Sequence, residues 1–177
     1  MTFEELGLRE EVLKSLKELG FEAPTPIQEQ AIPHLMKDED CDFVGLAQTG
    51  TGKTAAFGLP LISNIDLKSS LPQGLIICPT RELCLQITRD LETFSKYLNC
   101  NIVSVYGGAD IRRQMTQIKR GVSIIVATPG RLVDLINRKV IKLSEVKTVI
   151  LDEADEMLNM GFKEDIDAIL DSAPVTK

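Results

Sequence analysis

Short apolar runs, rich in Val and Ile, recur along the chain and are bounded by Gly, Pro, Asp or Thr. Runs of this length between turn-forming residues are typical of buried β-strands. The predicted strands are 42–47, 74–78, 101–106, 122–128 and 146–151.

The stretches between these runs carry helical spacing, with apolar residues at steps of three and four. The clearest case is the series Leu83, Ile87, Leu91, Phe94 and Leu98. Strands that alternate with helices predict right-handed crossovers, and therefore an α/β fold with a mostly parallel sheet covered by helices on both faces. Ligands of such sheets bind at the carboxyl ends of the strands.

The segment before the first strand is predicted to be helical. Apolar positions between Leu6 and Leu19 mark an amphipathic helix that stops at Gly20. A second helix is predicted to start after Pro24-Thr25-Pro26, with proline in its first turn. No internal repeat or linker separates these helices from the strands, so we expect one domain over residues 1–177.

Composition changes this picture only in detail. The chain has 44% hydrophobic and 26% charged residues, which is ordinary for a globular protein. The sequence shows neither an apolar stretch of the ~18 residues typical of a membrane span nor a signal-peptide pattern, so we expect a cytoplasmic protein with no membrane partner. The four cysteines and the single His34 lack zinc-site spacing, and buried cysteines are the simpler interpretation. A net charge of −6 means that any contact with nucleic acid must be local.

A glycine-rich loop follows the first predicted strand and leads into an apolar helix over 55–65. A phosphate-binding loop needs glycines whose N–H groups surround phosphate oxygens, a lysine that reaches the β and γ phosphates, and a hydroxyl for Mg²⁺. Ala47 replaces the first glycine of the usual pattern, and a plain Gly-rich turn is the alternative. The predicted nucleotide-binding residues of this loop are Ala47, Gln48, Thr49, Gly50, Thr51, Gly52, Lys53 and Thr54.

The last predicted strand ends in an acidic pair, Asp152-Glu153. In phosphoryl transfer one carboxylate holds Mg²⁺ and another group orients the attacking water. We therefore predict that Asp152 and Thr54 bind Mg²⁺, largely through water, and that Glu153 orients the water. Lys53 completes the predicted catalytic set. The acidic run alone is also compatible with an ordinary helix start.

Together these segments resemble the DEAD-box family of superfamily-two RNA helicases, and specifically the amino-terminal RecA-like domain of a bacterial member. Residues 1–30 are similar to the family's Q motif, through Phe3, Gly20-Phe21 and the run from Pro24 to Gln28. The resemblance implies that Gln28 binds the adenine edge and that Phe21 stacks on the ring. Without it, Gln28 would be interpreted as an exposed helix residue and Phe21 as a core residue.

Three further segments that follow strands resemble the family's RNA-binding loops. The resemblance implies that they hold the sugar-phosphate backbone of RNA with little sequence specificity, whereas Gly and Pro alone would indicate plain turns. The basic residues Arg112, Arg113, Lys119 and Arg120 are better explained as a solvated helix face than as RNA contacts. The predicted RNA-binding residues are Pro79, Thr80, Arg81, Glu82, Gly107, Gly108, Thr128, Pro129, Gly130 and Arg131.

The resemblance also implies elements that the core, residues 40–177, does not contain: a strand with a Ser-Ala-Thr motif and a second RecA-like domain. Arginines supplied to the γ-phosphate in related enzymes accelerate hydrolysis by about 10³ to 10⁵, so we expect this chain to bind ATP but to hydrolyse it slowly. The absent strand would lie between the first and last predicted strands, and we expect it to leave a destabilised or self-associating chain.

The sequence thus predicts the ATP-binding and RNA-binding half of an ATP-dependent RNA helicase, with ATP and Mg²⁺ as cofactors. Three alternatives remain: a nucleotide-dependent RNA clamp without unwinding, a DNA helicase, and a phosphate-loop switch. The sequence indicates neither a pathway nor a protein partner.

Overall fold

The computed structural model describes residues 1–37 and 42–174. Contacts divide these residues into two compact units, which are described separately. Of the described residues, the amino-terminal unit contains those within Met1–Ile65 and Asp90–Asn99, and the sheet unit contains Asp66–Arg89 and 100–174.

The sheet unit is built on parallel strands in the order β2-β3-β1-β4. Helices alternate with these strands along the chain, which confirms the predicted α/β fold with a parallel sheet. The elements are β1 (Gly74–Ile77), α4 (Arg81–Phe94), β2 (Ile102–Val105), α5 (Ile111–Lys119), β3 (Ile124–Ala127), α6 (Pro129–Asn137), β4 (Thr148–Leu151), α7 (Ala154–Asn159) and α8 (Lys163–Ser172). Helix α4 begins in this unit and ends in the amino-terminal unit.

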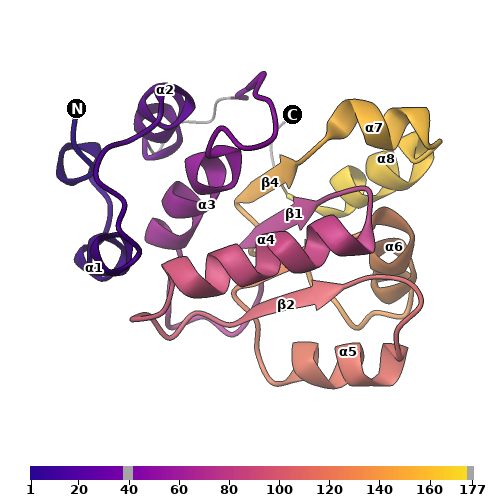
Figure 1. Cartoon of the computed structure of the whole chain (residues 1–177). Helices are drawn as coiled ribbons and strands as arrows, with labels where there is room; N and C mark the ends of the chain where they lie inside the picture. The colour runs from indigo at the N-terminus through magenta and orange to yellow at the C-terminus, as the bar shows by residue number, and fades with distance from the viewer. Residues whose placement is uncertain (38–41, 175–177) are drawn as a thin grey trace. The chain divides into compact units, whose positions relative to one another are not determined.

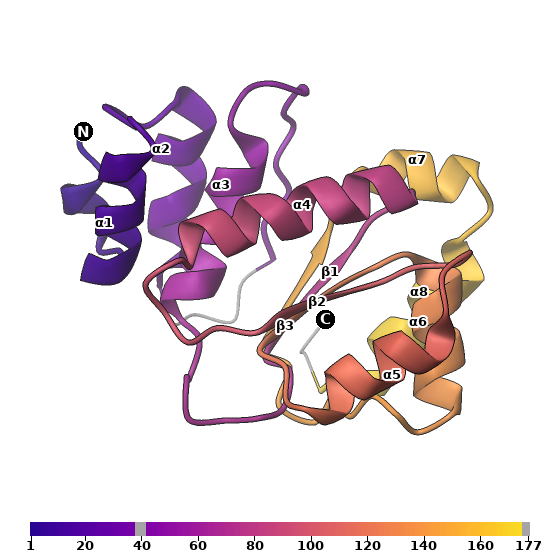
Figure 2. The same cartoon turned by 60° about the horizontal axis from the view of Figure 1, so that its bottom comes forward.

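Both faces of this sheet are covered by helices. Alternate strand residues, among them Leu75, Ile77 and Ile125, pack into one hydrophobic core with Leu132 and Leu135 of α6. Figure 2 shows α4 along one face of the sheet and α5 and α6 along the other. Each fully buried Leu or Ile in such a core stabilises the fold by roughly 1.5–3 kcal/mol. The core therefore fixes the strands whose ends carry the predicted binding loops.

The amino-terminal unit consists of helices (Figure 1). It contains a short 3₁₀ turn, Glu4–Leu6, followed by α1 (Glu10–Glu18), α2 (Pro26–Leu35) and α3 (Lys53–Ser63). As predicted, α1 ends just before Gly20, whose φ of +78° is a left-handed conformation that suits glycine, and α2 starts at Pro26. The Arg9 side chain donates a hydrogen bond of 2.7 Å to the Ile65 carbonyl and so ties the start of α1 to the end of this segment.

The prediction of a strand over 42–47 is wrong, because these residues have no regular secondary structure. Val44 is 87% and Leu46 93% exposed. A strand is stable only when its N–H and C=O groups have partners, and the ladders in the described part of the chain join only β1, β2, β3 and β4. Strand β4 itself pairs on one side with β1, and all four of its residues are only half-buried.

The two methionines that follow β4 differ in burial. Met157 is fully buried, whereas Met160 is 46% exposed. Helix α7 ends at Asn159, and Met160 lies at its carboxyl-terminal cap. Cys78 and Cys84 are buried as expected, Cys100 is half-buried, and Cys41 lies outside the described residues.

Within residues 1–37 and 42–174, no helix is both long and apolar enough to span a bilayer.

Substitution at Gly58 tests the packing of the amino-terminal unit. A Cβ atom at Gly58 in α3 would lie 2.6 Å from Cδ2 of Leu91, a fully buried side chain. We expect Gly58→Val to lower the free energy of unfolding by about 1–3 kcal/mol through overpacking. In urea unfolding, the double variant Gly58→Val with Leu91→Ala should lose less free energy of unfolding than the two single variants lose together, because the smaller alanine makes room for valine.

The matched control is Gly130→Val. Gly130 also lies in a helix, α6, but nothing is within 4 Å of its Cβ position. Equal losses at Gly58 and Gly130, or strict additivity with Leu91→Ala, would contradict the overpacking explanation.

Candidate functional site

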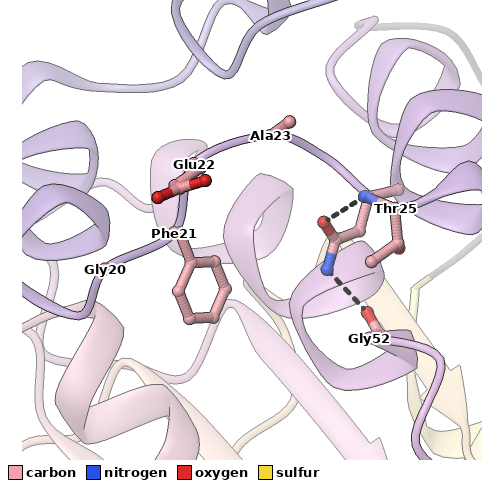
Figure 3. Close-up of a pocket in the computed structure, with 7 residues that line it drawn as sticks. Gly20, Phe21, Glu22, Ala23, Thr25 and Gly52 are labelled. Carbon is pink, nitrogen blue, oxygen red and sulfur yellow. Dashed lines mark hydrogen bonds between the residues drawn. The ribbon is translucent and has the colours of Figure 1, made fainter.

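The side chain of Gln28 links the start of α2 to the predicted phosphate loop. Gln28 is 2% exposed. Its Oε1 accepts a hydrogen bond of 3.0 Å from the Thr25 N–H, and its Nε2 donates one of 3.1 Å to the Gly52 carbonyl (Figure 3). The first of these bonds is half of a capping box, which satisfies a main-chain donor at the start of a helix. Gln28 is therefore a buried connecting residue and not an exposed helix residue.

A pocket of about 500 Å³ opens beside this amide. This volume is within the range of small-molecule sites. The pocket is lined by Gly20, Phe21, Glu22, Ala23, Thr25, Gln28 and Gly52, seen in Figure 3.

Neighbouring aromatic rings support Phe21 in this pocket. Its centroid lies 6.0 Å from that of Phe3 and 6.0 Å from that of Phe94, with interplanar angles of 47° and 77°. Tilted and edge-on pairs at this distance are favourable. Phe21 is half-buried, so its ring is held in place while part of it still faces the pocket.

The predicted phosphate loop reaches α3 through two glycines in the left-handed conformation. Gly50 has a φ of +85° and Gly52 a φ of +82°, and α3 begins at Lys53. The first turn of a helix carries N–H groups and a positive dipole end that favour a phosphate. Lys53 and Thr54 are half-buried in that turn, and Thr51 Oγ1 donates a 2.6 Å bond to the Gln48 carbonyl. Of the remaining loop residues, Ala47 is half-buried and Gln48, Thr49, Gly50 and Thr51 are exposed.

Only glycine fits at position 52. A Cβ atom there would lie 2.4 Å from Nε2 of Gln28 and 3.1 Å from Oγ1 of Thr25. The loop backbone is thus in direct contact with the amide that borders the pocket. This arrangement fits a nucleotide whose base occupies the pocket and whose phosphates follow the loop.

In the sheet unit, the remaining predicted residues follow the carboxyl ends of parallel strands. Hydrogen bonds continue the strand pairing by one residue on each side: Cys78 N–H to the Ala127 carbonyl at 2.9 Å, and Asp152 N–H to the Ile77 carbonyl at 2.9 Å. The loops after β1, β3 and β4 therefore leave the sheet at one edge, where α/β folds bind ligands. The loops after β1, β2, β3 and β4, together with the first turns of α4 and α6, carry Pro79, Thr80, Arg81, Glu82, Gly107, Gly108, Thr128, Pro129, Gly130, Arg131, Asp152 and Glu153.

The loop after β1 is fixed by side chains of its own. Thr80 Oγ1 accepts a 3.2 Å hydrogen bond from the Leu83 N–H, which caps the start of α4. The exposed Arg81 places its guanidinium 4.9 Å from the ring centroid of Tyr106, within cation–π range. Arg81 thereby connects the loop after β1 to the loop after β2.

Arg131 and Gln114 connect the first turn of α6, which follows β3, to the same loop after β2. Nη1 and Nη2 of Arg131 each donate a 3.2 Å hydrogen bond to the Ala109 carbonyl, and Nη1 donates another of 2.9 Å to Oε1 of Gln114. Gln114 Nε2 donates to the Tyr106 carbonyl at 3.2 Å. Sequence reasoning missed Gln114, although its helical spacing to the buried Ile118 was a signal that it faces inward. Arg112, Arg113, Lys119 and Arg120 are exposed, as a solvated face predicts.

The acidic pair combines burial with backbone strain. Asp152 is 4% exposed. Glu153, at the turn from β4 to α7, has φ 55° and ψ 50°. This left-handed conformation costs a non-glycine residue roughly 1–3 kcal/mol and is often found at functional sites. Within residues 1–37 and 42–174, no three His, Cys, Asp or Glu side chains form a group that could hold a metal ion.

Two buried thiols lie behind the loop after β1. The Cys84 thiol donates a 3.1 Å hydrogen bond to the Val126 carbonyl, and Cys78 and Cys84 are fully buried. A hydrogen bond to Cys84, together with burial, raises the pKa of the Cys78 thiol far above its usual range. Cys78 is therefore held as a neutral thiol.

Comparison with known proteins identifies relatives over almost the whole chain. The sequence profile of the "DEAD/DEAH box helicase" family matches residues 25–177. The chain is 53% identical over 175 residues to the "DEAD-box ATP-dependent RNA helicase CshA" of Bacillus cereus and 52% identical to the "ATP-dependent RNA helicase CshA" of Listeria monocytogenes. Each alignment covers 99% of this chain and 33% of the relative, so the chain spans about a third of the length of these curated relatives.

Solved structures show the same fold. A DEAD box protein from Methanococcus jannaschii superposes with a TM-score of 0.93 at 43% identity, over 98% of this chain and 47% of that one. Saccharomyces cerevisiae Dbp5 bound to RNA and ADP BeF3 superposes with a TM-score of 0.88 at 31% identity, over 98% of this chain and 44% of that one. The RecA-like fold expected from the sequence is thereby confirmed.

Alanine substitutions at Gly52 and Gly50 test the contact between the loop and Gln28. Both glycines have left-handed φ values, but only Gly52 has neighbours within 4 Å of its Cβ position. We expect Gly50→Ala to lower the free energy of unfolding by about 1–2 kcal/mol from backbone strain alone. In urea unfolding, Gly52→Ala should lower the free energy of unfolding by more than Gly50→Ala does. Adding Gln28→Ala to each glycine variant should remove this difference. Equal losses in the two glycine variants would show that the Gln28 contact is unimportant.

Alkylation tests the environment of the buried thiols. At neutral pH we expect iodoacetamide to leave Cys78 and Cys84 of the folded protein unmodified, because the thiolate is the reactive form and neither side chain is accessible. Peptide mapping by mass spectrometry should show the half-buried Cys100 modified before Cys78 and Cys84, and all four cysteines of the chain modified in urea. Rapid modification of Cys78 in the folded protein would contradict its raised pKa.

Proposed function

The chain belongs to the DEAD/DEAH box helicase family, and on that premise we propose that it is the ATP-binding and RNA-binding part of an ATP-dependent RNA helicase. One observation carries the nucleotide part of this proposal: the Gln28 amide lies in a pocket and contacts the backbone of the phosphate loop at Gly52. The Gln28 side chain thereby connects the proposed base-binding pocket to the proposed phosphate-binding loop.

ATP fits the chemistry of the amino-terminal unit. An amide side chain has two N–H donors and two acceptor lone pairs, and the hydrogen bonds of Gln28 to Thr25 and Gly52 use one of each. The remaining donor and acceptor match the edge of adenine, while the supported ring of Phe21 offers a stacking surface. The glycine-rich loop and the first turn of α3 would hold the phosphates, with Lys53 reaching the β and γ groups.

The reaction is hydrolysis of the γ-phosphate. Mg²⁺ bound with ATP would neutralise charge that develops on the phosphate oxygens. In this proposal Thr54 and Asp152 hold the ion, largely through water, and Glu153 orients the attacking water. The buried Asp152 and the strained turn at Glu153 support these roles, since such strain is common where a side chain must be held in one direction.

RNA is the proposed nucleic-acid partner of the sheet unit. The related Dbp5 has been solved bound to RNA, and the CshA relatives are named RNA helicases. The loops at the sheet edge supply main-chain N–H groups, helix starts and Arg81, which suit a sugar-phosphate backbone and leave the bases unread. This grip is local and therefore compatible with a net charge of −6. A cytoplasmic location and a second RecA-like domain in the whole protein belong to the same proposal.

Two other functions use the same residues. A nucleotide-dependent RNA clamp would bind both ligands without separating strands, and a DNA helicase would differ in its response to the 2′-hydroxyl. The names of the relatives favour an RNA helicase over both.

Titration with ATP and GTP, each with Mg²⁺, tests the nucleotide pocket. We expect the chain to prefer ATP and Gln28→Ala to lose at least about tenfold in ATP affinity, or ~1.4 kcal/mol, while GTP affinity changes little. Lys53→Ala should weaken both nucleotides, because the lysine contacts phosphate and not base.

The matched control is Gln30→Ala, an exposed glutamine two residues further along α2. It should bind both nucleotides like the unaltered chain. Loss of nucleotide binding by Gln30→Ala, or an ATP preference that survives in Gln28→Ala, would refute the pocket assignment.

A further inference from the structure

The loop after β2 carries the two glycines of the proposed RNA interface and is held from three directions. We define it as residues 106–110 and call it the Gly-Gly loop. Arg81 packs against the Tyr106 ring, Arg131 binds the Ala109 carbonyl, and Gln114 binds the Tyr106 carbonyl. Gly107 and Gly108, between these attachment points, are exposed, and nothing lies within 4 Å of either Cβ position. The loop is thus fixed at its two ends and open in its middle.

Gln114 is the centre of this network. It is 4% exposed, and both ends of its amide are used: Nε2 donates to the Tyr106 carbonyl at 3.2 Å and Oε1 accepts from Arg131 at 2.9 Å. A buried amide with both ends satisfied has one orientation, because rotation would leave polar groups without partners. Gln114 therefore connects the Gly-Gly loop to the first turn of α6.

The Arg131 guanidinium donates its hydrogen bonds to groups of the protein itself. Of its five N–H groups, the bonds to Ala109 and Gln114 occupy three, all on Nη1 and Nη2. Those N–H groups are not available to a phosphate at the same time. A planar fork that reaches two acceptors is a property of arginine that lysine does not share.

We propose that Gln114 and Arg131 are positioning residues of the RNA interface: they hold the Gly-Gly loop so that the Gly107–Gly108 backbone contacts RNA phosphates, and they act through that loop. This inference rests on the proposed function, and it assigns Arg131 a role different from the direct RNA contact expected from sequence. Gln114 becomes part of the interface although it is buried.

RNA affinity and loop order, measured on the same variants of the chain, test the proposal. The probe is a fluorescein-labelled oligouridylate, followed by anisotropy over a series of salt concentrations. We expect Gln114→Met, which keeps the side-chain length but removes the hydrogen bonds, to lose about tenfold in affinity, or ~1.4 kcal/mol. The slope of log affinity against log salt should stay unchanged, because this substitution removes no positively charged side chain from the RNA interface.

Arg131→Lys separates positioning from charge. If Arg131 holds the loop, Arg131→Lys should lose about as much affinity as Arg131→Ala, and the double variant Arg131→Ala with Gln114→Met should be no weaker than Arg131→Ala alone. If Arg131 instead contacts phosphate directly, Arg131→Lys should keep most of the affinity, and Arg131→Ala should lower the salt slope by about 0.7, as one lost phosphate contact predicts.

Amide hydrogen exchange gives a measure that does not depend on RNA. Residues 107–110 should exchange faster in Gln114→Met than in the matched control Gln117→Met, an exposed glutamine on the same helix, α5. Unchanged exchange in Gln114→Met, or faster exchange with unchanged RNA affinity, would overturn the positioning role. If the unaltered chain binds no RNA at low salt, the RNA part of the proposed function fails, and the positioning proposal fails with it.

Discussion

The parallel pairing of β1 with β3 and β4 positions the loops of the sheet unit. Ile77 at the end of β1 stands opposite Ala127 on one side and Leu151 on the other, so three strands end at one level. Main-chain bonds from Cys78 and Asp152 extend this pairing by one residue. Segments far apart in sequence therefore arrive at one edge of the sheet through backbone geometry alone. Side chains then only adjust what the backbone has already brought together.

In the amino-terminal unit, the Gln28 side chain holds together two segments that are distant in sequence, as backbone pairing does in the sheet unit. Gln28 satisfies the Thr25 N–H and the Gly52 carbonyl, and Gly52 leaves no space for a Cβ atom between them. This contact explains why a glutamine and a glycine distant in sequence depend on each other. In the proposed nucleotide site, the amide for the base and the loop for the phosphates are therefore held in one geometry before any ligand binds, which would lower the entropic cost of binding.

Sequence predicted the parts of this structure that depend on local pattern. The helix that ends at Gly20, the proline start of α2 and four strands follow from spacing and turn residues. The prediction of a strand over 42–47 was wrong because an apolar run shows only that a segment is suited to a strand. Whether a neighbouring strand pairs with it depends on distant parts of the chain. Gln114 was missed for a related reason: the hydrogen-bond partners of its amide, Tyr106 and Arg131, lie outside its own helix. Nucleotide and RNA roles came from motif resemblance and stay proposals, since geometry alone does not name a ligand.

The side chains at the sheet edge are largely occupied with one another. Thr80 caps α4, Arg81 packs on Tyr106, and Arg131 binds Ala109 and Gln114. Because Thr80 and Arg131 are engaged within the protein, the proposed RNA interface offers mainly N–H groups of the loop backbone, together with the exposed Arg81. Main-chain donors fit phosphate oxygens but do not distinguish bases, so the interface should tolerate many sequences. Affinity in an acidic chain then depends less on total charge than on how accurately the loops are placed, and a buried amide such as Gln114 can matter as much as an exposed cation.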